Sequence, residues 1–164
     1  MAASRTQVRL ILRILDQAFN QKSWHGPNLR GSLRGITSTQ ASWRPGKNRH
    51  SIRDLALHAA YWKYVVRRQL LGEKRGSFPL AGSNWFAHSE IGPHSWKADL
   101  KVLEQTHQSL RAVVARMDDA MLRRKPSRRS VTTLDLLLGV AAHDLYHAGQ
   151  IQLIKRLHQR RSNR

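Results

Sequence analysis

The sequence predicts an all-α protein that folds as a four-helix bundle. Four long segments repeat their apolar residues with the period of a helix, and no segment alternates apolar and polar residues as a strand does. Capping sequences precede two of these segments. With 164 residues, the chain is long enough for one domain with a sizeable core. We expect a single domain over residues 1–160, followed by a basic tail at residues 161–164.

The first predicted helix covers residues 5–22, in which the apolar residues fall on one face. The Gly-Pro pair at residues 26–27 stops this pattern, because glycine is flexible and proline lacks the N–H that a helix needs. A short helical piece is expected within residues 24–36, with Asn28 as its cap. Residues 37–50 are predicted to form a loop.

The second predicted helix covers residues 51–71. Ser51 and Asp54 have the spacing of a capping box, and Gly72 is well placed to end the helix. Residues 73–94 then form a long connection that is rich in glycine, proline, serine and aromatic residues. Because structureless connections of this length are uncommon in small domains and are often functional, we expect this one to contribute to a site.

Two further helices complete the predicted bundle. The third covers residues 95–120, where the apolar residues follow a heptad-like stripe. The fourth covers residues 132–157, and Thr132 with Asp135 again has the spacing of a capping box. Each helix can bury its apolar stripe only against its neighbours. An antiparallel four-helix arrangement follows, with room for crossover connections in the long loops.

The net charge of +19 and the isoelectric point near 11.7 are extreme for a small domain. Such a charge favours binding to nucleic acid or another anionic surface. The basic residues gather at residues 123–129 and 155–164, but neither cluster is interleaved with aromatic residues, and no nucleic-acid-binding motif is present. Solvated surface charge is therefore the favoured interpretation, and nucleic-acid binding is the alternative.

The chain contains no cysteine, which excludes disulfides, thiolate metal sites and a cysteine nucleophile. Any thiol chemistry would need an external thiol. Charged residues interrupt the first 21 residues, unlike the apolar core of a signal peptide. No stretch approaches the length of about 20 apolar residues that a membrane span needs. We expect a cytoplasmic protein that does not enter the membrane.

Histidines provide the candidate site. His143 and His147 are four residues apart on an inward stripe of the fourth predicted helix, so their rings share one face. His58 lies on the inward stripe of the second predicted helix. Neutral imidazoles bind zinc, nickel, copper or iron, and three of them leave a position open for water or a substrate atom. The alternative is three core histidines, each with its own hydrogen bonds.

Other residues are candidates for the surroundings of this site. Gln150 follows His147 by three residues and can face the same point. His107 is a fourth inward histidine, expected at another level of the bundle as a core or supporting residue. Packing in the core or in a loop is the alternative for each aromatic ring near the site. The candidates for the pocket mouth are Trp24, His25, Trp62 and Trp85.

Several stretches together resemble the DinB/YfiT-like family of bacterial helical proteins. The resemblance covers nearly the whole chain. Its most specific part is the combination of H-x3-W in the second predicted helix with H-x3-H-x2-Q-I in the fourth. The matching stretches are residues 18–19, 24–29, 50–62, 84–85, 95–96 and 133–151.

This resemblance implies a four-helix bundle with up-down-down-up connectivity that forms a homodimer. It also implies a divalent metal ion held by His58, His143 and His147, with zinc and nickel ahead of iron and manganese. Characterised relatives include transferases and isomerases that use low-molecular-weight thiols. With a net charge of +19, this chain is much more basic than the resemblance leads us to expect.

The leading functional hypothesis is a metal-dependent enzyme of the S-transferase or hydrolase type. In that role the metal activates an external thiol or a water towards a small-molecule substrate. No general base is visible beyond the histidines. The alternative is a non-catalytic metal-binding or stress-response module whose basic surface binds nucleic acid.

Overall fold

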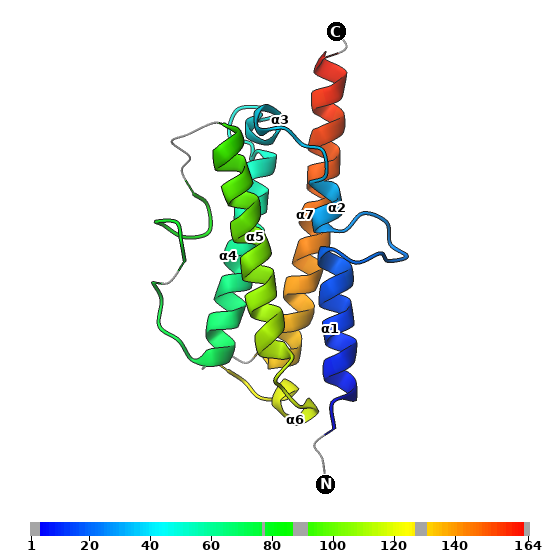
Figure 1. Cartoon of the computed structure of the whole chain (residues 1–164), viewed down its shortest axis with the longest axis vertical. Coiled ribbons are helices and arrows are strands. Elements are labelled where there is room, and N and C mark those ends of the chain that lie inside the picture. The colour runs from blue at the N-terminus through cyan, green and yellow to red at the C-terminus, as the bar shows by residue number, and fades with distance from the viewer. Residues whose placement is uncertain (1–3, 77, 87–91, 127–130, 163–164) are drawn as a thin grey trace.

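The computed structural model describes residues 4–76, 78–86, 92–126 and 131–162, and every regular element within them is a helix. The predicted all-α fold is therefore confirmed. No helix in these ranges is long and apolar enough to cross a membrane. The long helices of the bundle (Figure 1) are α1 (Thr6–Phe19), α4 (Ile52–Leu71), α5 (Pro93–Val114) and α7 (Thr133–Ser162). The short ones are α2 (Leu29–Ser32), α3 (Ser38–Ser42) and α6 (Asp119–Leu122).

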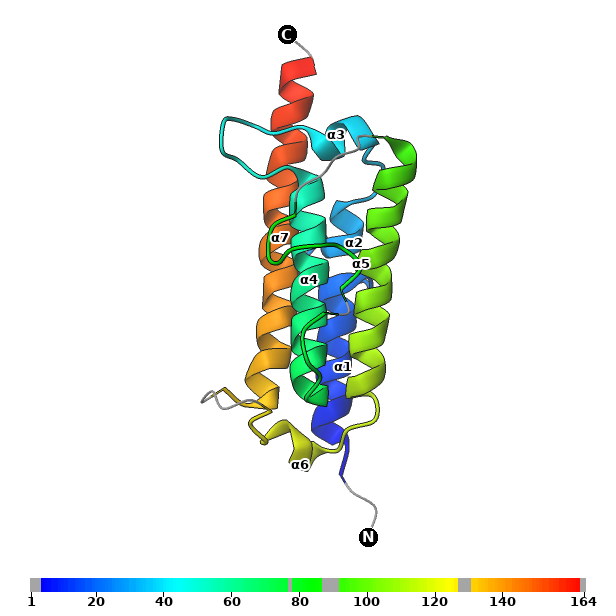
Figure 2. The ribbon, with the colours of Figure 1, turned by 90° about the vertical axis from the view of Figure 1, so that its left-hand side faces the viewer.

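The four long helices do not simply alternate in direction. In Figure 1, α1 and α7 run from the bottom of the view to the top, while α4 and α5 both run from the top to the bottom. Because α4 and α5 are parallel, the segment that joins them must return along the length of the bundle. Figure 2 shows the described part of this connection passing over the outer side of α4.

Aromatic side chains hold this connection against α4. Phe86 is buried and Phe78 is half-buried, and both pack with Tyr61 and Tyr64 of the helix. The ring centroids of Phe78 and Phe86 are 5.1 Å apart, and those of Tyr61 and Phe86 are 5.6 Å apart. The connection is thus fixed next to α4, where its backbone can reach side chains of that helix.

Helix α4 begins and ends at the predicted residues, because both of its ends have local caps. The Ser51 hydroxyl accepts a hydrogen bond from the Asp54 N–H (3.1 Å), and the Asp54 carboxylate accepts one from the Ser51 N–H (2.8 Å). Gly72 follows the helix with φ of 67°, a left-handed conformation that a residue without Cβ adopts at little cost.

The segment predicted as a loop at residues 37–50 contains helix α3. The Thr37 hydroxyl accepts a bond from the Gln40 N–H (3.3 Å), and Gln40 Oε1 accepts one from the Thr37 N–H (3.0 Å). Ala41 is fully buried and docks this short helix on the core. The loop prediction was wrong here because a helix of five residues is too short to show apolar periodicity.

The third predicted helix was too long, and the fourth was too short. Helix α5 ends at Val114 rather than at residue 120, and α6 forms separately. The carboxylate of Asp119 in α6 accepts a bond from the N–H of Val8 in α1 (2.9 Å), so a tertiary contact favours the break. Helix α7 continues to Ser162, and the expected basic tail therefore begins inside its last turn.

Of the three buried apolar clusters among the described residues, two include side chains of both α4 and α7. Along α7, Ala141 belongs to one cluster and Ile151 to the other, with two of the candidate histidines between them in sequence. Along α4, Leu55 belongs to the cluster of Ile151 and Val66 to the cluster of Ala141, and His58 lies between them in sequence. Burial of each leucine, isoleucine or valine side chain among them contributes about 1.5–3 kcal/mol to stability. The core thus fixes the separation of α4 and α7 on both sides of the histidines.

Candidate metal centre

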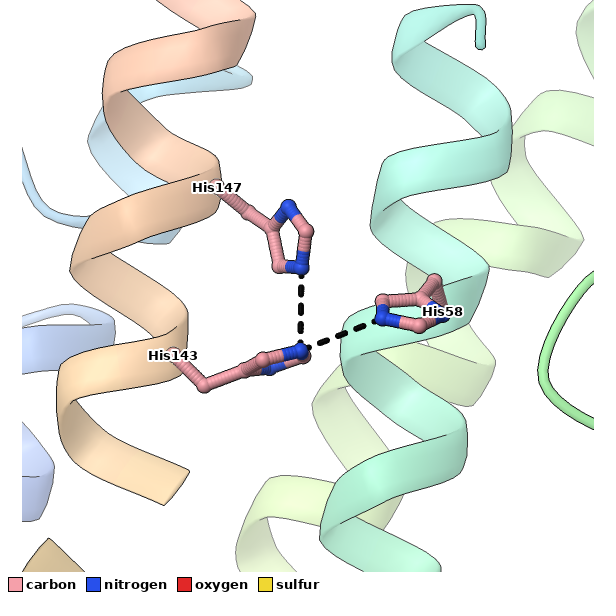
Figure 3. A group of neighbouring side chains, drawn as sticks. All are labelled: His58, His143 and His147. Atoms are coloured by element: carbon pink, nitrogen blue, oxygen red, sulfur yellow. Dashed lines mark hydrogen bonds between the residues drawn. The ribbon is translucent and has the colours of Figure 1, made fainter. Parts of the chain in front are cut away.

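Three histidines from two helices meet between α4 and α7. His58 Nε2 lies 3.1 Å from His143 Nε2, and His147 Nε2 lies 3.0 Å from the same atom. Figure 3 shows the three rings turned towards one point between the helices. His58 and His147 are buried, and His143 is half-buried. The structure therefore brings together the three histidines that the sequence singled out.

The hydrogen bonds around these rings determine which nitrogen carries the proton. His58 Nδ1 lies 3.0 Å from the backbone carbonyl oxygen of Asn84, and His147 Nδ1 lies 2.7 Å from Oε1 of Gln150. Both oxygens can only accept, so both Nδ1 atoms donate. In the neutral rings, Nε2 of His58 and Nε2 of His147 then carry lone pairs, and both point at His143.

This donor set fits one divalent metal ion. The Nε2 lone pairs of His58 and His147 both face Nε2 of His143, which can donate at most one proton. At least one of these two lone pairs therefore has no hydrogen-bond donor. Three nitrogens bound to one ion at about 2.0–2.1 Å lie about 2.8–3.4 Å apart. The observed separations of 3.0 and 3.1 Å fall within that range. Zinc, nickel, copper and iron are the ions that prefer imidazole ligands.

Burial keeps the three rings neutral. Burial, together with the other two histidines and Lys63, lowers the pKa of His143 to about 3. Burial lowers the pKa of His147 to about 4, although its hydrogen bond to Gln150 acts in the opposite direction. The pKa of His58 is also lowered, mainly by burial. At pH 7 the rings can therefore bind a metal ion without first losing a proton.

The sequence model of the DinB superfamily matches residues 22–151, which include all three histidines. The chain belongs to the DinB superfamily. The crystal structure of a conserved protein from Enterococcus faecalis is similar, with a TM-score of 0.67 and 16% sequence identity, and the match covers 95% of this chain and 98% of that chain. At this identity the likeness shows the fold alone. No functionally curated protein matches the chain.

In this DinB-superfamily chain, the connection between α4 and α5 shapes the surroundings of His58. Asn84 has φ of 64°, a left-handed conformation that asparagine tolerates, and the Trp85 N–H donates to the Ser83 carbonyl across it (2.7 Å). This tight turn presents the Asn84 carbonyl to His58, while Asn84 Oδ1 accepts a bond from Trp62 Nε1 (3.0 Å). One loop residue therefore orients a candidate ligand and a neighbouring tryptophan.

Two tryptophans border the three histidines. Trp85 stacks on His58 with ring centroids 4.0 Å apart, and on His50 with centroids 3.5 Å apart. Trp62 meets His58 and His143 edge-on, at 6.2 and 6.3 Å. Both tryptophan residues are 37% exposed, so they lie at the surface beside the histidines. Access to the site is thus narrowed by aromatic rings.

A buried ion pair joins the two helices that carry the three histidines. The ammonium of Lys63 on α4 donates to both carboxylate oxygens of Asp144 on α7, and each side chain is only 1% exposed. Asp144 directly follows His143, so its side chain leaves the helix in another direction. Burial raises the pKa of the Asp144 carboxyl, and the Lys63 ammonium opposes that rise. The pair ties α4 to α7 at the level of the histidines.

Three of the other predicted residues contact the histidines. Gln150 accepts the hydrogen bond from His147, and Trp62 and Trp85 contact His58 as described above. Two others lie on the loop between α1 and α2, which the structure does not bring to the histidines. Trp24 is fully exposed there, and His25, also exposed, has its Nε2 2.7 Å from the Ser23 hydroxyl.

His107 also lies outside the cluster. It is buried on the side of α5 that faces α1, where its ring stacks on Phe19 of α1 with centroids 3.8 Å apart. Its Nε2 is 3.6 Å from an oxygen of Asp16, too far for a hydrogen bond, and that carboxylate is bound by Arg111 (2.7 and 2.9 Å). His107 therefore belongs to the core.

The Asn84 carbonyl and the pair of Lys63 and Asp144 were not predicted from the sequence. Every residue has a backbone carbonyl, so the residue type does not show which carbonyl accepts a hydrogen bond. The available signal was an asparagine, which tolerates a left-handed backbone, beside a tryptophan in a long connection. The ion pair spans 81 residues, so no local pattern links its members. A lysine within an apolar helix was the one hint, since a buried charge needs a partner.

Proposed function

We propose that this DinB-superfamily protein is a metal-dependent enzyme of the S-transferase or hydrolase type that acts on a small molecule. The convergence of the neutral Nε2 atoms of His58, His143 and His147 carries this proposal. We propose zinc or nickel as the ion, with iron and manganese as the alternatives.

The metal and the chain have separate roles in this proposal. When bound, a divalent ion supplies a Lewis acid that favours the deprotonated form of a thiol or of water. Three protein ligands leave a position for such a group. Asn84 and Gln150 hold the Nδ1 protons of His58 and His147, which keeps the Nε2 lone pairs available. Because the chain has no cysteine, the thiol would be an external cosubstrate.

Metal analysis of protein purified without added metal tests the proposal. We expect about one ion per chain in the native protein, and its loss in His58→Ala and in His147→Ala. His25→Ala is the matched control, because His25 is exposed and contacts Ser23 rather than the cluster. Retention of the metal by both variants would exclude the three-histidine site. Thiol transfer to an electrophilic dye and ester hydrolysis, each assayed with and without chelator, then distinguish the two reaction types.

A basic surface at one end of α7 favours a second candidate function, binding to nucleic acid. Figure 1 shows the last turns of α7 extending beyond the other helices. Arg156, Arg160 and Arg161 are exposed there, and none of them forms an ion pair with another described residue. The described part of α7 contains no acidic residue after Asp144. Unpaired cations on a protruding helix are suited to phosphate groups.

Binding of a labelled DNA duplex at two salt concentrations tests this second function. Three phosphate contacts would reduce the affinity roughly 40-fold between 50 and 200 mM salt. Replacing Arg156, Arg160 and Arg161 by alanine should remove most of this dependence. The control replaces Arg9 and Arg13, which are exposed on α1. No measurable affinity at 50 mM salt would exclude the function.

A further inference from the structure

A cleft of about 210 Å³ runs along the groove between α4 and α7 and ends at the three-histidine cluster. Trp62 and His143, whose rings contact each other, form that end. The α4 side is otherwise formed by Val65, Val66 and Gln69, and the opposite side by Val131, Asp135, Leu136, Gly139 and Val140.

The spacing of the lining residues shows that the cleft is a continuous groove. On α4 they lie at positions 62, 65, 66 and 69, and on α7 at positions 135, 136, 139, 140 and 143, so neighbours along each groove wall are three or four residues apart. Each set is therefore one stripe of its helix. Seven residues at 1.5 Å each give the groove a length of about 10 Å. Between its two polar ends, the walls are valine and leucine side chains with one glycine.

Gly139 lines the cleft without a side chain that would fill it. A Cβ atom placed on Gly139 would meet nothing within 4 Å, so no neighbouring atom requires a glycine there. Its backbone is helical, and glycine is the least favourable residue after proline inside a helix. Neither packing nor backbone conformation explains the residue. Its lack of a side chain does leave free space at the mouth of the cleft.

We propose that the cleft binds the apolar portion of a small substrate whose reactive polar group reaches the histidine cluster. The position of that reactive group rests on the proposed metal-dependent function. The apolar walls select a linear alkyl or flat aryl group over a charged one, because burying an unpaired charge there is unfavourable. The side chain at position 139 sets how large that group can be.

The size of the cleft favours a small molecule over a second protein. Ten residues line it, whereas a stable protein interface uses about 20–30 residues on each side. A volume of about 210 Å³ exceeds the roughly 30 Å³ share of one water and lies just below the range of drug-sized ligand pockets. A short alkyl or aryl group matches these dimensions.

Straight-chain primary alcohols from 1-butanol to 1-octanol probe the cleft without the metal. Their binding is measured by titration calorimetry on chelator-treated protein. We expect the affinity to rise about fourfold per methylene until the chain fills the groove. Gly139→Leu should abolish this rise, and Gly139→Ala should shorten the longest chain that still gains affinity.

Gly149→Leu is the matched control. Gly149 is also exposed on α7 with nothing within 4 Å of a Cβ, but it does not line the cleft. The Gly149→Leu variant should bind the alcohols with the same affinities as the native protein. Circular dichroism should show that all variants are folded. Affinity that is independent of chain length, or an equal loss in Gly149→Leu, would overturn the proposal. So would alcohol affinities that fall as the native protein self-associates, because a second copy would then cover the cleft.

Alkylhydroxamates of the same chain lengths, titrated into zinc-loaded protein, test the link to the histidines. We expect the same gain per methylene, and an affinity at least tenfold above that of the metal-free protein. If the alcohols show the chain-length dependence but the hydroxamates gain nothing from zinc, the apolar cleft stands and the metal-dependent function is wrong. If only zinc matters and chain length does not, the cleft proposal is wrong and the metal site stands.

Discussion

At the scale of single residues, Gln150 holds the Nδ1 proton of His147 through a bond of 2.7 Å. Gln150→Leu keeps a side chain of similar size and removes the acceptor. The His147 ring then loses its fixed orientation, and its Nε2 lone pair is less available. We expect metal affinity to fall about 10- to 100-fold, measured by competition with a chromogenic chelator.

Gln152→Leu provides the control for this change. Gln152 lies two residues further along α7 and is half-buried, but it has no bond to the histidines. Its replacement should leave the metal affinity unchanged. Equal affinities for the native protein and for Gln150→Leu would show that the side chain does not orient His147.

His107 makes the stability of the protein depend on pH. Burial, together with the Lys63 charge, lowers the pKa of His107 to about 3, against a value of 6.5 in an exposed histidine. Between these values the unfolded chain binds a proton that the folded chain excludes. The contribution to stability is therefore complete above pH 6.5 and is lost as the pH falls towards 3, with a slope of up to about 1.4 kcal/mol per pH unit.

His107→Phe removes this titrating group and keeps the stacking on Phe19. The free energy of unfolding, measured in urea on chelator-treated protein, should fall less steeply in the variant than in the native protein between pH 6.5 and 4. The other buried histidines titrate in both proteins and cancel in the comparison. Parallel curves would show that His107 is protonated equally in the folded and unfolded chains.

At the scale of helices, the Lys63–Asp144 pair holds α4 against α7. Lys63→Met leaves a buried carboxylate without its partner, which should reduce the free energy of unfolding by about 3–5 kcal/mol. The double variant Lys63→Met, Asp144→Leu removes both charges and should recover most of this loss. Urea unfolding measures both effects. Additive losses in the double variant would argue against a coupled pair.

The helices that the sequence predicted best are those with caps and long apolar stripes. Ser51 and Gly72 define α4 through local bonds, so its ends could be read from residue types. The end of α5 depends on contacts between α6 and α1 through Asp119, which no local pattern contains. The three histidines could be predicted because helical spacing places them inward, whereas the Asn84 carbonyl comes from the path of a long connection.

At the scale of the whole molecule, α7 carries large apolar side chains that the other described residues leave partly exposed. Tyr146 and Leu153 are 64% and 59% exposed, and Leu138 and Leu157 are each 40% exposed. Such exposure is unusual on a monomer. We expect a homodimer across these side chains, favoured by higher salt because each copy carries a charge of +19.

Sedimentation at several protein concentrations tests this dimer. Tyr146→Lys combined with Leu153→Lys should shift the protein to a monomer, because it would place charges inside the contact. Leu10→Lys is the control, since Leu10 is 56% exposed on α1. A native protein that sediments as a monomer at all concentrations, or a control with the same effect as the double variant, would exclude a dimer through α7.

A crystal structure with anomalous scattering measured at the zinc and nickel absorption edges tests directly whether the three histidines bind a metal ion. We expect one anomalous peak about 2.0–2.1 Å from Nε2 of His58, His143 and His147, with Nδ1 of His58 still at the Asn84 carbonyl and Nδ1 of His147 still at Gln150. Crystals grown with both metals that show no peak between these nitrogens, or show it elsewhere, would contradict the three-histidine metal site.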